Sequence, residues 1–172
     1  IERYGAPKNP NITHYAFFHE ACRNELVTEG ILRLLLDHFP DAASFLGRDE
    51  DVPLHEMCFN KNATLGMVQL IIDAYPESLR RANNEGQSPL HGLCLNENLN
   101  EEAGLEILKY FIERCPESVR HTSNNGSLPL HFAAEKQSPD FCRILIEAYP
   151  GSERMTVGNH SFLPFHWACK YN

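Results

Sequence analysis

An internal repeat constrains the fold of this chain more strongly than any other feature of its sequence, because a repeat architecture folds unit by unit. Five segments align on a histidine that is preceded by Pro-Leu or a related pair, and these histidines are His19, His55, His91, His131 and His166. Successive steps between them are 36, 36, 40 and 35 residues. With a period of about 36, the 172 residues predict nearly five units in place of one globular domain.

A proline marks the other end of each unit. It follows an aromatic residue or a cysteine in Phe39-Pro40, Tyr75-Pro76, Cys115-Pro116 and Tyr149-Pro150. The interval from this proline to the next histidine is 15, 15, 15 and 16 residues, whereas the interval from histidine to proline is 21, 21, 25 and 19. We therefore expect the length variation to lie in the connection inside each unit. The enlarged third connection, at 96–104, is a further candidate for partner contact.

Each unit has the pattern of two helices. Pro89, with Ser88 before it as a candidate N-cap, is typical of a helix start, and a short apolar face follows. A longer helix then carries a stripe such as Val68, Ile71 and Ile72, and the next proline ends it. An Asn- and Gly-rich turn leads into the following unit. Because such a helix pair has two apolar faces, it is stable only when stacked on its neighbours, which predicts an all-α solenoid.

The Pro-Leu-His segments, the second helix rich in Leu, Ile and Val, and the Asn/Gly turn resemble the ankyrin repeat, whose signature is Thr-Pro-Leu-His. The resemblance covers the chain from about Thr13 and implies an ankyrin-type α-solenoid of helix-turn-helix units joined by short hairpin-like turns. The expected boundaries are a lead-in at 1–12 and an array at 13–172, divided into 13–47, 48–82, 83–122, 123–157 and a partial fifth repeat at 158–172. The Tyr-Pro-Glu-Ser segment from Tyr75 to Ser78 is similar to a divergent, slightly longer ankyrin subtype like that of algal arrays, such as those of diatoms.

The chain departs from the ankyrin pattern at several positions. The place of the signature threonine, which hydrogen-bonds the histidine in the family, is taken by Val52, Ser88, Leu128 and Leu163. Only Ser88 can make that bond, so we expect the histidines to depend on a backbone carbonyl of a neighbouring unit. Glu50 stands where later turns have Gly86 and Gly126, which leaves the shape of the first hairpin turn open. Phe17-Phe18 in place of Pro-Leu predicts an irregular first unit.

A recurring His-x-x-Cys pattern is the one constellation that suggests a metal, at His19/Cys22, His55/Cys58, His91/Cys94 and His166/Cys169. A structural zinc needs four ligands in one small cluster, whereas stacked helices lie roughly 8 to 10 Å apart. We therefore interpret the cysteines as small buried residues, equivalent to Ala134, and keep a metal-binding module as the weaker alternative. Catalysis uses one constellation while packing repeats, and no hydrolase, phosphate-loop or metalloprotease motif is present. The chain is not expected to be an enzyme or to need a cofactor or metal.

Charge and composition exclude other classes of partner. The net charge is −8 and the basic residues are scattered, which argues against nucleic acid. The longest apolar run is too short for membrane insertion. Unpaired core-type cysteines favour an intracellular compartment, cytoplasmic or nuclear, and the protein is expected to be monomeric. The sequons at Asn11, Asn62, Asn125 and Asn159 have turn chemistry as their simplest explanation, and glycosylation stays open. We also expect further repeats to follow and the C-terminal end of this segment to fray.

The resemblance implies that a protein partner contacts the concave face, formed by the hairpin tips and the outward side of the first helices. Transferred position by position, the candidate contacts are Arg23, Asn24, Arg48, Asp49, Asp51, Phe59, Asn60, Asn84, Glu85, Gln87, Leu95, Asn96, Asn124, Asn125, Ser127, Glu135 and Lys136. Phe59 and Leu95 are the expected anchors, because interface energy concentrates in a few apolar or aromatic side chains. The favoured function is a non-catalytic protein-interaction scaffold. The alternative is a regulatory or docking segment of a larger enzyme or channel.

Overall fold

The structure, a computed structural model, describes residues 15–157 and 161–171 and forms nine α-helices within them. The first helices of successive units are α2 (Ala16–Arg23), α4 (Pro53–Phe59), α6 (Pro89–Leu95), α8 (Pro129–Lys136) and α10 (Pro164–Tyr171). The second helices are α3 (Glu29–His38), α5 (Leu65–Ala74), α7 (Glu101–Arg114) and α9 (Pro139–Ala148). The lead-in at 1–12, Thr13 and the sequons at Asn11 and Asn159 lie outside the described residues.

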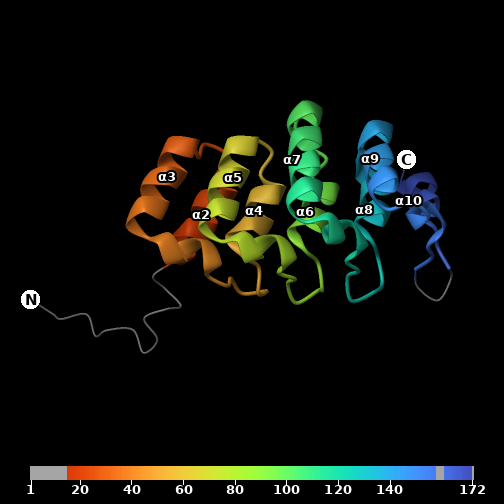
Figure 1. Cartoon of the computed structure of the whole chain (residues 1–172), viewed down its shortest axis with the longest axis horizontal. Helices are drawn as coiled ribbons and strands as arrows, with labels where there is room; N and C mark the ends of the chain where they lie inside the picture. The colour runs from red at the N-terminus through yellow and green to blue at the C-terminus, as the bar shows by residue number, and fades with distance from the viewer. Residues whose placement is uncertain (1–14, 158–160, 172) are drawn as a thin grey trace, which may run out of the picture.

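The helices form two rows. Each first helix packs against the first helix of the next unit, and each second helix packs in the same way against its counterpart, as Figure 1 shows. The turns between units lie together at one edge of the array. The chain is therefore an all-α solenoid, as its repeats predict.

Local sequence explains where each second helix begins and ends. Thr28, Thr64, Asn100 and Ser138 are the N-cap residues, and each side chain accepts a hydrogen bond from the backbone N–H three residues later. At the other end, α3, α5 and α7 stop two residues before a proline, which begins a 3-10 helix: η1 (Pro40–Ser44), η2 (Pro76–Arg80) and η3 (Pro116–Arg120). In the fourth unit the 3-10 helix η4 (Ser152–Arg154) follows Gly151, which adopts a positive φ of 93°. The proline thus stops the second helix and starts a tighter turn toward the next unit.

The four extra residues of the third unit do not enlarge its loop, and that expectation was wrong. Five residues, 96–100, join α6 to α7, as five residues join α2 to α3 and α4 to α5. The insertion instead lengthens the helix, since α7 has 14 residues and α3, α5 and α9 have 10 each. Asn100 caps the longer helix. The negative charges of Glu101 and Glu102, in its first turn, interact favourably with the positive end of the helix dipole. α7 consequently extends past its neighbours (Figure 1).

Glu50 does not change the shape of the first hairpin turn. It adopts a φ of 60°, close to the 71° of Gly86 and the 84° of Gly126. The closing hydrogen bond from Gly47 N to Asp51 O, at 2.8 Å, repeats that from Asn83 N to Gln87 O, at 2.9 Å. A residue with a side chain is energetically disfavoured in the left-handed region of backbone angles. The first turn therefore keeps the common geometry at a cost in backbone strain.

The core lies between the two rows of helices. The residue before each histidine is fully or almost fully buried in the first four units, at Phe18, Leu54, Leu90 and Leu130. The corresponding Phe165 of α10 is 50% exposed. Packing between repeats, and not a single central core, therefore holds the chain together.

Candidate functional site

The first-helix face is the name used here for the surface made by the exposed ends of the first helices and by the turns at 47–51, 83–87 and 123–127. Nine of the candidate contacts are exposed on it: Arg23, Asn24, Arg48, Asp49, Phe59, Asn84, Glu85, Asn124 and Asn125. Asp51, Gln87, Leu95, Glu135 and Lys136 are half-buried. These side chains come from the three turns and from the four first helices before α10, so they form one extended surface.

Asn60 and Asn96 are buried and hydrogen-bond to other parts of the chain. Contrary to the expectation from the sequence, they are therefore not placed to contact a partner. The Nδ2 of Asn60 donates to the carbonyls of Cys22 (2.9 Å) and Asn24 (3.1 Å) at the end of the preceding first helix. Asn96 repeats this one unit later, donating to Cys58 O (2.9 Å) and Asn60 O (3.2 Å). We call these two residues and Gln137, which donates to Cys94 O and Asn96 O, the amide ladder. It satisfies the free carbonyls at the ends of the first helices.

Ser127 is also buried, so its side chain is not accessible to a partner protein. Its backbone carbonyl accepts a hydrogen bond from His91 Nε2 at 3.2 Å. Its position in the turn is therefore fixed by the array, and the buried side chains of Ser127, Asn60 and Asn96 are not available to a partner.

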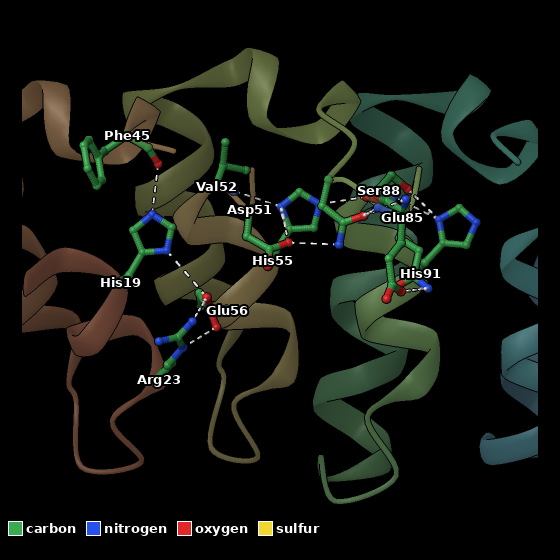
Figure 2. A network of polar contacts seen from close by, with 12 residues as sticks. His19, Arg23, Phe45, Asp51, Val52, His55, Glu56, Glu85, Ser88 and His91 are labelled. Atoms are coloured by element: carbon green, nitrogen blue, oxygen red, sulfur yellow. Dashed lines mark hydrogen bonds and ion pairs between the residues drawn. The ribbon is translucent and has the colours of Figure 1, made fainter. Parts of the chain in front are cut away.

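The repeated histidines are structural. The Nδ1 of His55 accepts the backbone N–H of Val52 at 3.1 Å, and Nε2 donates to the carbonyl of Gln87, in the next turn, at 3.0 Å (Figure 2). His91 and His131 repeat this pair of bonds, and together with His55 they are called the histidine ladder. Ser88, as expected, is the residue whose hydroxyl also lies within 3.0 Å of its histidine. The dependence on a neighbouring carbonyl is confirmed.

Burial keeps the histidine ladder neutral. It lowers the pKa of His55 and His131, and it lowers the pKa of His91 to about 4, although the bonds to backbone carbonyls oppose the change. A neutral imidazole whose two nitrogens both serve backbone groups has no free position for a proton transfer or a metal. These three side chains accordingly link neighbouring units through hydrogen bonds.

The cysteines of the His-x-x-Cys pattern pack in the core in the first three units. Cys22, Cys58 and Cys94 are buried free thiols, and burial raises their pKa far above the ordinary value, so they are poor nucleophiles. Cys169, of the last pair, is exposed. Within 15–157 and 161–171, no three His, Cys, Asp or Glu side chains are grouped so that they would hold a metal ion.

A pocket of about 510 Å³ opens on the first-helix face beside α2. It is lined by Ala16, His19, Glu20, Arg23, Phe45, Gly47, Arg48, Asp49, Asp51 and Glu56. Arg23 pairs with the carboxylate of Glu56 through two donors, Nη2 and Nε, the latter at 2.7 Å from Oε2. Burial alone would raise the pKa of Glu56, but His19 and Arg23 hold it below its usual value.

The sequence did not indicate this pocket. The resemblance places Arg23, with Asn24, on the partner surface, whereas in the structure Arg23 also forms an ion pair, across 33 positions of the chain, with a glutamate that directly follows a repeat histidine. The acidic residue at that place, in Glu20 and Glu56, is the signal that could have drawn attention to it, because later units have Gly92 and Phe132 there.

Two rows of stacked helices with turns along one edge define a helical-repeat solenoid. Residues 99–172 match the family model of ankyrin repeats in 3 copies, and the helices before them continue the same architecture. A search of curated proteins found no match. Ankyrin repeats are in general protein-interaction modules and not enzymes. Across the part of the chain that the structure covers, no helix is long and apolar enough to cross a membrane.

Proposed function

We propose that this chain is a protein-interaction scaffold whose partner binds the first-helix face. The observation that carries the proposal is Phe59, an aromatic residue at the end of α4 that is 51% exposed. Its ring lies against Gly92 of α6, where an added Cβ would come within 3.1 Å of Phe59 Cε2. The absence of a side chain at Gly92 leaves room for the ring on the surface.

An exposed aromatic side chain among polar neighbours has the composition of an interface anchor. The proposed contacts are Arg23, Asn24, Arg48, Asp49, Asp51, Phe59, Asn84, Glu85, Gln87, Leu95, Asn124, Asn125, Glu135 and Lys136. Leu95 is half-buried and packs partly on the core, so we assign the larger share of the binding free energy to Phe59.

Capture of a partner from an extract of the source cells, with the tagged 172-residue chain as bait, tests the proposal. Phe59→Ala should weaken capture about tenfold, the loss of a hot-spot residue. Leu34→Ala is the matched control, because Leu34 is 57% exposed on α3, in the other row of helices. Equal capture by wild type and both variants would refute binding at this face.

Stability must be measured on the same variants. Because half of the Phe59 side chain is already in water, Phe59→Ala should lower Tm by no more than about 2–4 °C, the equivalent of roughly 1 kcal/mol in a chain of this size. A larger decrease would make Phe59 a core residue and remove the basis of the proposal.

We also propose that the protein works as a monomer in a reducing compartment. The five buried cysteines are unpaired, which favours such a compartment. Light scattering on the purified chain, with and without a reductant, would detect a dimer and show whether a disulfide links it.

A further inference from the structure

The pocket beside α2 contains a buried polar atom that forms no hydrogen bond. His19 is 4% exposed, and its Nε2 donates to Phe45 O at 2.9 Å. Its Nδ1 has no hydrogen-bond partner, and the nearest charged atom is Glu56 Oε1, 3.6 Å away. In the histidine ladder the equivalent nitrogen accepts a backbone N–H, so His19 is the departure.

These contacts leave one ring nitrogen without a partner. Nε2 donates to a carbonyl and so carries a hydrogen, whereas Nδ1 forms no hydrogen bond. Figure 2 shows this nitrogen pointing at Glu56, whose other side faces Arg23. Nδ1 and Glu56 Oε1 face each other across 3.6 Å, a distance too long for a hydrogen bond. The carboxylate of Glu56 can therefore accept a further hydrogen bond from a donor outside the chain.

The charge around the pocket selects the kind of donor. Four carboxylates line it, at Glu20, Asp49, Asp51 and Glu56, against the two guanidinium groups of Arg23 and Arg48. Arg23 is already paired with Glu56 and Glu20. The remaining field is negative and disfavours an anion, whereas a cation that brings N–H donors fits it.

The size and walls of the pocket fit a long side chain. Its volume of about 510 Å³ is well above the roughly 30 Å³ that one water occupies in the liquid, so a side chain and several waters fit together. Ala16 and the half-buried ring of Phe45 provide apolar contact for a methylene stem, and the aromatic ring adds attraction for a cation.

We propose that this pocket receives the lysine or arginine side chain of a basic segment in the partner protein, with its N–H groups directed at the Glu56 carboxylate beside His19. The inference rests on the proposed function, because it names the chemistry of the partner that the first-helix face binds. The net charge of −8 supports it, since a basic segment would be attracted to the whole chain before it docks.

The probes are three labelled peptides of equal length, (Arg-Gly)5, (Gln-Gly)5 and (Glu-Gly)5, titrated with the intact chain at 0.15 M salt and followed by fluorescence anisotropy. Only the arginine peptide should bind. Glu56→Gln should weaken it roughly tenfold and Asp49→Asn roughly threefold, as expected for one charged hydrogen bond and one exposed charge. The matched controls are Glu106→Gln on α7 and Asp73→Asn on α5, both exposed, which remove the same charge elsewhere. They should leave binding unchanged.

The imidazole signals of His19 in a nitrogen-15 NMR spectrum give a second readout that does not depend on a variant. The arginine peptide should shift the Nδ1 resonance of His19 and leave that of His55 in place. Equal losses in pocket and control variants, with no His19 shift, would mean general attraction to an acidic surface and would overturn the inference.

The two proposals can fail separately. If partner capture is lost in Phe59→Ala but is unaffected by Asp49→Asn and Glu56→Gln, the scaffold function stands and the pocket assignment is wrong. If capture is unaffected by all three substitutions, both are wrong.

Discussion

Acidification should destabilise this protein through its buried histidines, and His91 allows the effect to be calculated. The side chain is fully buried, and burial lowers its pKa from 6.5 to about 4. Above pH 6.5 the imidazole is neutral in both the folded and the unfolded chain. Between that pH and 4, the unfolded chain binds a proton that the folded chain does not, so the free energy of unfolding falls as the pH falls.

The expected loss follows from the two pKa values. A shift of one unit corresponds to about 1.4 kcal/mol. From pH 7 to pH 5, His91 alone should remove about 2 kcal/mol from the free energy of unfolding. His55 and His131, whose pKa values burial also lowers, add to the loss in the same direction. Because the pKa of Glu56 is lowered in the folded chain, the stability that this carboxylate contributes is lost only below pH 4.5, outside this window.

Urea unfolding at pH 7, 6 and 5, followed by circular dichroism, measures the effect. His91→Gln should be less stable than wild type at pH 7, because it breaks the bonds of His91 to Ser88 and Ser127. From pH 7 to pH 5, its free energy of unfolding should nevertheless fall by about 2 kcal/mol less than that of wild type. His38→Gln on α3, an exposed position, is the control and should keep the wild-type pH dependence. An unchanged pH dependence in His91→Gln would refute the assignment of His91 as a buried neutral group.

Two further predictions concern the backbone and the amide ladder. Glu50→Gly should raise the free energy of unfolding by about 0.5–1 kcal/mol, since relief of a left-handed residue outweighs the entropy that glycine gains on unfolding. Gly86→Ala in the next turn should do the opposite in the same urea assay, because its Cβ would lie 2.7 Å from Asn124 N. Asn96→Ala should cost about 2–3 kcal/mol, because two buried carbonyls lose their donor. Asn98→Ala, at an exposed position two residues later, should change stability by less than about 0.5 kcal/mol.

The helices and their order could be predicted from the sequence, because each rests on local chemistry that repeats. The spacing of histidine and proline located both helices of the first four units and the first helix of the fifth, and the dependence of the histidines on neighbouring carbonyls followed from the missing threonine. The interval from His91 to Pro116 gave the length of the insertion but not its conformation. Asn100, followed by two glutamates, was the capping signal that places it in the helix.

Side-chain direction was the part that the sequence could not supply. Asn60 and Asn96 each follow the last residue of a first helix. There, a backbone rotation decides whether the side chain points into solvent or toward the neighbouring unit. Free carbonyls at the end of the preceding helix draw both side chains inward. The pocket beside His19 depends on contacts between Arg23 and Glu56, which a repeat pattern places in adjacent units without placing them together.

The two ladders connect neighbouring units in opposite directions. His55 donates forward to the turn of the next unit, whereas Asn96 donates back to the helix of the preceding one. If a single unit unfolds, groups on both of its neighbours lose their partners, so the penalty is felt on each side. In a one-dimensional array this raises the interface term relative to the intrinsic stability of a repeat, and it favours unfolding of the described units in one cooperative transition. A chain shortened by one repeat should therefore lose more stability than the contacts inside that repeat account for.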